Sequence, residues 1–100
     1  MKSEYGNYIK VYDFMISKLQ LAKYDLLVYA YIFSYTVQGR CYSGSQQTLA
    51  DRFGTCRKTI AEVLKKLTAS GLLIKTEIPI PQGKGCEYEC NLESISEYHV

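Results

Sequence analysis

Two adjacent cations, Arg57 and Lys58, stand at the start of a predicted helix, where binding explains them better than folding does. The first turn of a helix carries backbone N–H groups without partners and the positive end of the helix dipole. A cation in that turn costs about 0.3–1 kcal/mol of stability. A bound anion offsets this cost, and helix N-termini are ready-made phosphate sites. The pair therefore predicts a site for a phosphate group.

The residues around this pair predict two helices joined by a tight turn. Ser45 is a suitable N-cap for a first helix over residues 46–53. Gly54 can adopt the left-handed conformation that the turn needs. The second helix is predicted to open at the Cys56-Arg57-Lys58-Thr59 segment and to run to about Ala69. Its apolar residues have the i, i+3, i+4, i+7 spacing of a helix that faces a core: Cys56, Ile60, Val63, Leu64 and Leu67.

The N-terminal half predicts two more helices and a short strand. Asp13 is a suitable N-cap for a brief helix from Phe14 to Leu19. A long helix is predicted from Ala22 to Val37, with Gly39 as the residue that ends it. Residues 41–43 predict one short strand before Ser45.

The C-terminal part predicts a β-hairpin. Residues 72–77 and 86–92 read as strands, and the second alternates apolar and polar residues, as a strand with one buried face does. Residues 78–85 contain two prolines and two glycines and predict a flexible loop between the strands. We therefore expect an α+β, mainly α fold, with one domain over residues 1–92. Residues 93–100 are expected to form a tail or the start of a linker.

This order of elements resembles the winged helix–turn–helix domains. The resemblance rests on the spacing of Ala50, Gly54, Ile60 and Val63 and on the hairpin that follows Gly71. A narrower resemblance is to the N-terminal winged-helix domains of plasmid and phage replication initiators, including replication initiator protein A and related replisome organisers. It is carried by Phe14-Met15, Leu19-x-Leu21, Tyr29-Ala30-Tyr31, Gly39 and Tyr42-Ser43-Gly44-Ser45. That family binds iterated or palindromic origin DNA, commonly as a dimer.

The resemblance implies that the helix from Arg57 to Ala69 is a recognition helix for double-stranded DNA. Arg57 or Lys58 would then donate to guanine or to phosphate, and Glu62 would accept from cytosine. For Glu62 we favour the alternative of an ion pair with Lys58 or Lys66 one turn away. Lys65 and Lys66 also suit the C-terminal half of a helix whether or not DNA is bound. The implied DNA-binding residues are Gln46, Cys56, Arg57, Lys58, Thr59, Ala61, Glu62, Lys65 and Lys84.

Two of these residues carry open alternatives. Lys84 lies between two glycines at the predicted wing tip, where it either reaches DNA or only makes the loop soluble. Cys56 occupies a capping position where the family usually has Ser or Thr. A thiol beside Arg57 and Lys58 should have a lowered pKa, which permits redox sensing. The apolar spacing instead favours a plain buried cysteine, with Thr55 as an alternative cap, and we prefer the buried cysteine.

The remaining reactive residues predict neither a metal site nor a catalytic site. The four cysteines match no C-x-x-C pair and no disulfide framework, and a zinc site would need Cys86 and Cys90 with distant partners. His99 is the only histidine. The sequence holds no Ser/His/Asp set and no phosphate-binding glycine loop. We expect no enzyme activity and no cofactor.

The predicted helix from Ala22 to Val37 is apolar on all sides. A helix of this kind is buried all round, and a chain of 100 residues rarely wraps one helix completely. We therefore expect a second chain or a missing domain to cover the rest, and we predict a homodimer formed through this helix and the N-terminal segment. In the alternative, the tyrosines of the helix leave their hydroxyl groups in water over a one-sided core.

Composition and charge agree with a small folded DNA-binding domain. Hydrophobic residues make up 47% and charged residues 22% of the chain, and no apolar run is long enough to span a bilayer. The N-terminus has no signal-peptide pattern, so we expect a cytoplasmic protein without a membrane partner. Residues 51–84 carry seven cations and three acids, whereas residues 85–100 carry four glutamates and no Lys or Arg. The basic block coincides with the two helices around Gly54.

Two other functions stay open. A winged-helix transcriptional regulator would use the same DNA contacts as a replication initiator. A winged helix used for protein–protein assembly would instead dock a partner on the helix from Ala22 to Val37.

Overall fold

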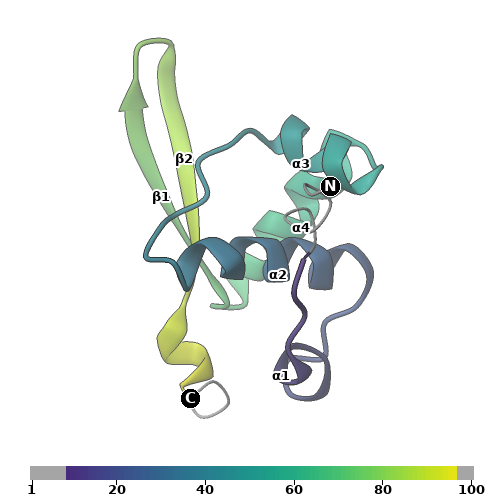
Figure 1. The fold of residues 1–100 in the computed structure, drawn as a ribbon. Coiled ribbons are helices and arrows are strands. Elements are labelled where there is room, and N and C mark those ends of the chain that lie inside the picture. Colours follow the sequence, from purple (N-terminus) through teal and green to yellow (C-terminus); the bar gives the residue numbers. More distant parts are fainter. Residues whose placement is uncertain (1–8, 97–100) are drawn as a thin grey trace, which may run out of the picture.

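The computed structural model describes residues 9–96, with the exception of the side chain of Lys84. The helices cluster together and the hairpin projects away from them (Figure 1). This arrangement confirms the predicted α+β, mainly α architecture with a C-terminal hairpin. In chain order the elements are α1 (Asp13–Ser17), α2 (Lys23–Thr36), α3 (Gln46–Phe53), α4 (Arg57–Ala69), β1 (Leu73–Ile80), β2 (Gly83–Cys90) and the short 3-10 helix η2 (Leu92–Ile95).

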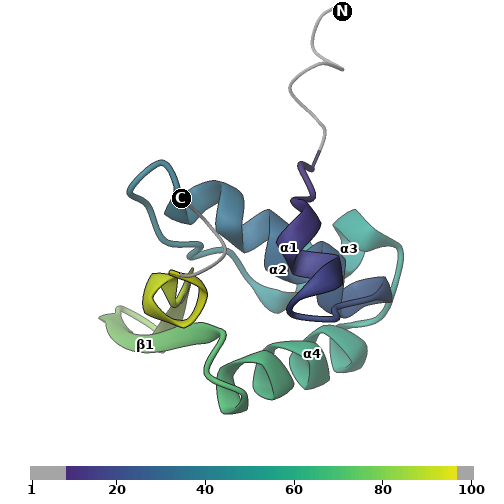
Figure 2. The same ribbon diagram turned by 90° about the horizontal axis from the view of Figure 1, so that it is seen from below.

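Helix α2 lies at the centre of the fold. It contacts α1, α3, α4 and β2, and Figures 1 and 2 show these elements distributed around it. From Tyr24 to Thr36 every residue is buried or half-buried within this one chain. The expectation that a second chain must cover α2 is therefore not needed to explain its composition.

Two tyrosines of α2 pack against each other and against the segment before α3. The hydroxyl oxygens of Tyr31 and Tyr35 are 3.2 Å apart, within hydrogen-bonding distance. Both rings pack edge-on against the ring of Tyr42, with centroids 5.7 and 5.6 Å away. The rings are therefore covered by Tyr42, and each hydroxyl group has a hydrogen-bond partner within the chain.

The two helices around Gly54 form as the sequence predicts. The side chain of Ser45 accepts a hydrogen bond from the backbone N–H of Thr48 at 3.0 Å, which caps α3. Gly54 has a φ of 68°, and the next residue, Thr55, donates its N–H to the carbonyl of Ala50 at 2.9 Å. This left-handed glycine ends α3 and turns the chain into α4. Ala50 and Ile60 are fully buried where the two helices meet.

The predicted Pro/Gly loop over residues 78–85 is wrong. Strand β1 continues to Ile80 and β2 begins at Gly83, so that only Pro81 and Gln82 form the turn. Pro79 pairs with Lys84 inside the ladder. Proline is tolerated there because β1 has no strand on its other side within the described sheet, so a missing N–H on that side breaks no ladder hydrogen bond.

The start of α1 also differs from the prediction. The N-cap position belongs to Tyr12, and Asp13 is the first residue of a helix that ends at Ser17 rather than Leu19. The hydroxyl of Ser17 donates to the carboxylate of Asp13 at 3.1 Å. An acidic residue suits the first turn of a helix as well as the cap position, which is why the sequence pattern was ambiguous by one residue.

Hydrogen bonds attach the base of the hairpin to the segment before α3 and to α2. The predicted strand at residues 41–43 is a single bridge in which Tyr42 and Tyr88 exchange backbone hydrogen bonds of 2.8 and 2.9 Å. The backbone N–H of Cys90 donates to the hydroxyl of Thr36 at 3.0 Å. Beyond the hairpin, Ile95 is buried in the same core, although it lies in the segment expected to be a tail.

Replacing Thr36 with valine should lower the free energy of unfolding by about 1–3 kcal/mol, because the buried N–H of Cys90 loses its acceptor at nearly constant side-chain volume. Chemical denaturation of Thr36→Val measures the change. Thr76→Val is the matched control, since Thr76 is exposed on β1, and it should stay within about 0.5 kcal/mol of the wild type. Equal effects of the two substitutions would contradict this role of Thr36.

Candidate nucleic-acid interface

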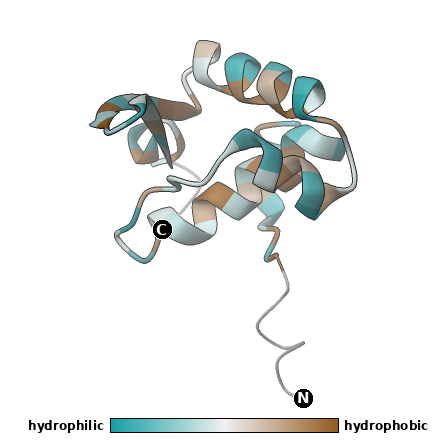
Figure 3. Cartoon of the chain, turned by 90° about the horizontal axis from the view of Figure 1, so that it is seen from above, coloured by the Kyte–Doolittle hydropathy of each residue, from teal (hydrophilic) through white to brown (hydrophobic). Residues whose placement is uncertain are grey.

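The outer side of α4 carries a line of cations, whereas its inner side belongs to the core. Ile60, Val63, Leu64 and Leu67 are buried, and Figure 3 shows the hydrophobic colouring of α4 on its inner side. Arg57 and Lys58 are both exposed in the first turn, which holds no acidic residue. Ala61 and Lys65 follow at intervals of three or four residues and so continue the same stripe. The stripe is a basic surface with a small residue in its middle.

The neighbouring lysines of α4 have different surroundings. Lys66 places its Nζ atom 2.5 Å from the carboxylate of Asp25, and this ion pair connects α4 to α2. Lys65 makes no ion pair within the described residues and borders a groove that Lys75 of β1 also lines. Lys66 therefore has a structural partner, while the charge of Lys65 is available for binding.

The ion pair that we favoured for Glu62 is wrong. Lys66 is engaged by Asp25, and among the described residues Glu62 pairs with neither Lys66 nor Lys58. The carboxylate of Glu62 is exposed beside the basic stripe. It is consequently accessible as a hydrogen-bond acceptor.

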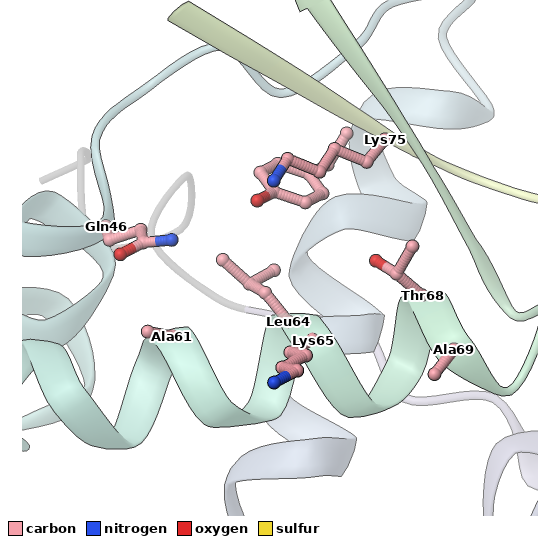
Figure 4. Close-up of a pocket in the computed structure, with 8 residues that line it drawn as sticks. Gln46, Ala61, Leu64, Lys65, Thr68, Ala69 and Lys75 are labelled. Atoms are coloured by element: carbon pink, nitrogen blue, oxygen red, sulfur yellow. The ribbon is translucent and has the colours of Figure 1, made fainter.

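A groove with a volume of about 420 Å³ lies between α4 and β1. Figure 4 shows Gln46, Leu64 and Lys75 pointing toward this gap from α3, α4 and β1. Of the predicted site residues, the structure brings Gln46, Ala61 and Lys65 together here, while Arg57, Lys58 and Thr59 lie closer to the N-terminus of α4. The groove is lined by Gln46, Ala61, Leu64, Lys65, Thr68, Ala69, Lys75 and Tyr88.

Lys75 is a basic residue of this surface that the sequence pattern did not single out. In the hairpin it pairs with Tyr88, and it lies two residues after the buried Leu73. Alternate residues of a strand share a face, so Lys75 is on the face that turns toward α4. The sequence does indicate that Lys75 shares a strand face with Leu73. It does not indicate that this face lies against α4, which is a feature of the tertiary packing.

Lys84 has a backbone position near the end of the hairpin, opposite Pro79. Its side chain lies outside the described residues, as do the N-terminal residues before Ile9 and the single histidine, His99. The predicted contact of Lys84 with DNA therefore stays a prediction.

Cys56 is exposed, so the buried cysteine that we preferred is wrong. It holds the N-cap position of α4, which settles the choice between Cys56 and Thr55. Cys56 continues the apolar spacing of α4, but it precedes the first turn of the helix and lies beyond the edge of the core. The Sγ atom of Cys56 is 3.3 Å from the hydroxyl of Thr59. This hydrogen bond, followed by backbone N–H groups of the first turn, lowers the pKa of the thiol below its ordinary value.

Neither a metal centre nor a membrane span is found in the part of the chain that the structure describes. No three or more His, Cys, Asp or Glu side chains come together there in a way that could hold a metal ion. Among the described helices, none combines the length and the apolar composition that crossing a bilayer requires.

Comparison with known proteins gives one match. A family model described as a helix-turn-helix domain matches residues 19–73, which is just over half of the chain. The matched region contains α2, α3 and α4 and stops at the first residue of β1. The match supports a helix–turn–helix DNA-binding domain. Searches among curated proteins and among solved structures found no match.

Alkylation should distinguish the cysteines at neutral pH. Cys56 should react with iodoacetamide first, because it is exposed and its lowered pKa increases the fraction of thiolate. Cys90 should react last, because burial raises the pKa of its thiol to about 12. Peptide mass spectrometry after timed labelling measures the order.

Thr59→Val should slow the labelling of Cys56 and shift its pH dependence to higher pH, since the hydroxyl that stabilises the thiolate is lost. Cys41, whose thiol lies near Glu87 and Glu89 of β2, is the internal control. Faster labelling of Cys90 than of Cys56 would contradict the described burial.

Proposed function

The chain belongs to the helix-turn-helix domain family, and we propose that it binds double-stranded DNA in a sequence-specific manner by placing the outer side of α4 in the major groove. The observation that carries this proposal is the exposed pair Arg57 and Lys58 in a helix turn without any acidic residue. DNA supplies the anion that this turn lacks, since a duplex carries one negative charge per ~1.7 Å of its axis.

The residues of α4 divide into phosphate contacts and base contacts. Arg57 and Lys58 lie where the helix would enter the groove, so they bind phosphate or the O6 and N7 atoms of guanine. Ala61 leaves space for a thymine methyl group beside the helix. Glu62, which has no ion pair within the described residues, accepts from the amino group of cytosine. Gln46 at the start of α3 contacts the DNA backbone.

We further propose that the DNA is a replication origin and that the chain positions an initiator there. This proposal is supported by the resemblance of residues 8–45 to the N-terminal domains of plasmid and phage replication initiators. A transcriptional regulator would use the same side chains, so only the identity of the bound sequence separates the two roles. The assembly alternative is less favoured, because from Tyr24 to Thr36 no residue of α2 is fully exposed.

We also propose that two copies bind together on palindromic or iterated DNA, as the resemblance implies. The surface of α2 is less suited to this contact than expected, since from Tyr24 to Thr36 no residue is fully exposed. The first described residues of the N-terminal segment offer more apolar surface: Val11 is 39% exposed and Ile16 in α1 is 53% exposed. We therefore place the dimer contact at the N-terminal segment and α1.

Replacing both Arg57 and Lys58 with alanine should weaken binding to a selected duplex about tenfold or more, because a bidentate contact to guanine alone is worth about 1–3 kcal/mol. The slope of log K against log salt should fall by about 0.9 for each lost phosphate contact. Site selection from random duplexes supplies the DNA, and fluorescence anisotropy at two salt concentrations measures both quantities.

Arg40→Ala is the control, because Arg40 is exposed in the segment between α2 and α3, away from the stripe on α4 and from the proposed dimer contact. It should leave the affinity nearly unchanged. If the variant with both Arg57 and Lys58 replaced kept the affinity and the salt slope of the wild type, the proposal would be contradicted. Selection of a sequence found at an origin would support the replication role, and a promoter sequence would favour the regulator.

Sedimentation velocity at micromolar concentration should show a dimer on a palindromic duplex. Ile16→Glu should reduce this complex to one copy per duplex, because a charge is introduced into the proposed contact. One wild-type copy per palindromic duplex would contradict the dimer.

A further inference from the structure

We infer that the groove between α4 and β1 holds the sugar–phosphate backbone of one DNA strand, with Lys65 and Lys75 contacting its phosphates from opposite walls. This inference rests on the proposed function and deepens it, because it assigns a DNA contact to the base of the hairpin. The occupant is a strand of duplex DNA rather than a free anion.

The two walls are set by elements that are fixed to each other. Helix α4 contributes Lys65, and β1 contributes Lys75 opposite the nearly buried Tyr88. Helix α4 contacts both α2 and β1, and the Tyr42–Tyr88 bridge attaches β2 to the segment before α3. Figure 4 shows Lys75 extending over the gap toward the side where Gln46 lies. The two ammonium groups are therefore carried on a preformed frame.

The charge of the lining selects an anion. Among the described residues, Lys65 and Lys75 are the only charged ones that line it, and both are exposed and make no ion pair there. No acidic side chain in the part of the chain that the structure describes lines the groove. Two cations beside one hollow give it a positive potential, which attracts an anion.

The shape and polarity of the lining favour a nucleic-acid strand over inorganic phosphate. Leu64, Ala61 and the ring of Tyr88 provide an apolar surface of the kind that deoxyribose can cover. Ala61 and Ala69 lie four residues before and after Lys65, so small side chains leave room for the chain on both sides of the lysine. The groove also lies beside the middle of α4, away from the N–H groups that bind small anions at a helix start.

The groove is continuous with the surface proposed for base reading. Ala61 belongs both to the groove and to the stripe that begins at Arg57 and Lys58. A duplex seated with α4 in its major groove would bring one of the two strands that flank that groove toward the hairpin. Lys75 would then fix the distance between the hairpin and α4 on the DNA, which sets the register of the base contacts.

The test uses the full chain and the selected duplex, with single methylphosphonate substitutions that neutralise one phosphate at a time. In the wild type, a methylphosphonate at one position or at either of two adjacent positions should weaken binding, because the neutralised phosphate is the one held in the groove. At those positions Lys65→Ala and Lys75→Ala should cause no further loss, whereas the effect of Arg57→Ala should persist. On the unmodified duplex each lysine variant should lower the salt slope by about 0.9, so that a fourfold rise in salt costs it about threefold less affinity than it costs the wild type.

Lys66→Ala is the matched control, because it removes the same charge from the next position of α4 but faces Asp25 instead of the groove. In Lys66→Ala the same methylphosphonate positions should weaken binding as in the wild type, and the salt slope should equal that of the wild type. Thermal unfolding of Lys65→Ala and Lys75→Ala should match the wild type, since both residues are exposed.

The outcomes separate the two proposals. A wild type that binds no duplex overturns both of them. Loss of binding in Arg57→Ala with an unchanged salt slope in Lys75→Ala overturns only the groove. A third outcome also overturns only the groove proposal. Inorganic phosphate would shift the Lys75 and Tyr88 resonances, while Lys65→Ala and Lys75→Ala would weaken binding equally at every methylphosphonate position. The groove would then bind a small anion only.

Discussion

The burial of α2 by its own chain is the packing constraint on which the other features depend. Val28, Ala30 and Ile32 are almost completely inaccessible to solvent, and α1, α3, α4 and β2 all contact this helix. Apolar burial is the dominant favourable term in folding, at about 25 cal/mol per Å². A helix apolar on every side can be satisfied only if several elements surround it. The positions of α3, α4 and the hairpin follow from that requirement.

With α4 held against α2, its two sides acquire separate roles. The inner side is occupied by Ile60, Leu64 and Leu67, and Lys66 joins Asp25 of α2 at the margin. The cations Arg57, Lys58 and Lys65 have no such partner in the described part of the chain and stay on the outside. The hairpin is fixed to the same centre through Thr36 and Tyr42, and Lys75 of β1 therefore lines the same groove as Lys65. The basic surface is therefore a consequence of the core.

Local signals were sufficient to predict the part of the chain around Gly54. The Ser45 cap, the left-handed glycine and the apolar spacing of α4 are each set by neighbours within a few residues, and the structure has all three. The hairpin was misjudged because Pro79 and Pro81 usually mark loops, while an edge strand accepts proline where no neighbour needs its N–H. Cys56 follows the helical spacing, but the core ends before it, and the spacing alone does not show where a core ends. Lys75 became a candidate only once tertiary packing placed β1 beside α4.

The most direct test of DNA binding through α4 is a titration of the full chain with the selected duplex, followed through its backbone amide resonances. We predict that the shifted resonances belong to the first turn of α4, to Ala61 and Lys65, and to β1 around Lys75, whereas Val28 to Phe33 in α2 stay unchanged. Shifts confined to α2 or to the isoleucine face of the hairpin, Ile74 and Ile80, would contradict this mode of binding, as would a spectrum that the duplex leaves unchanged.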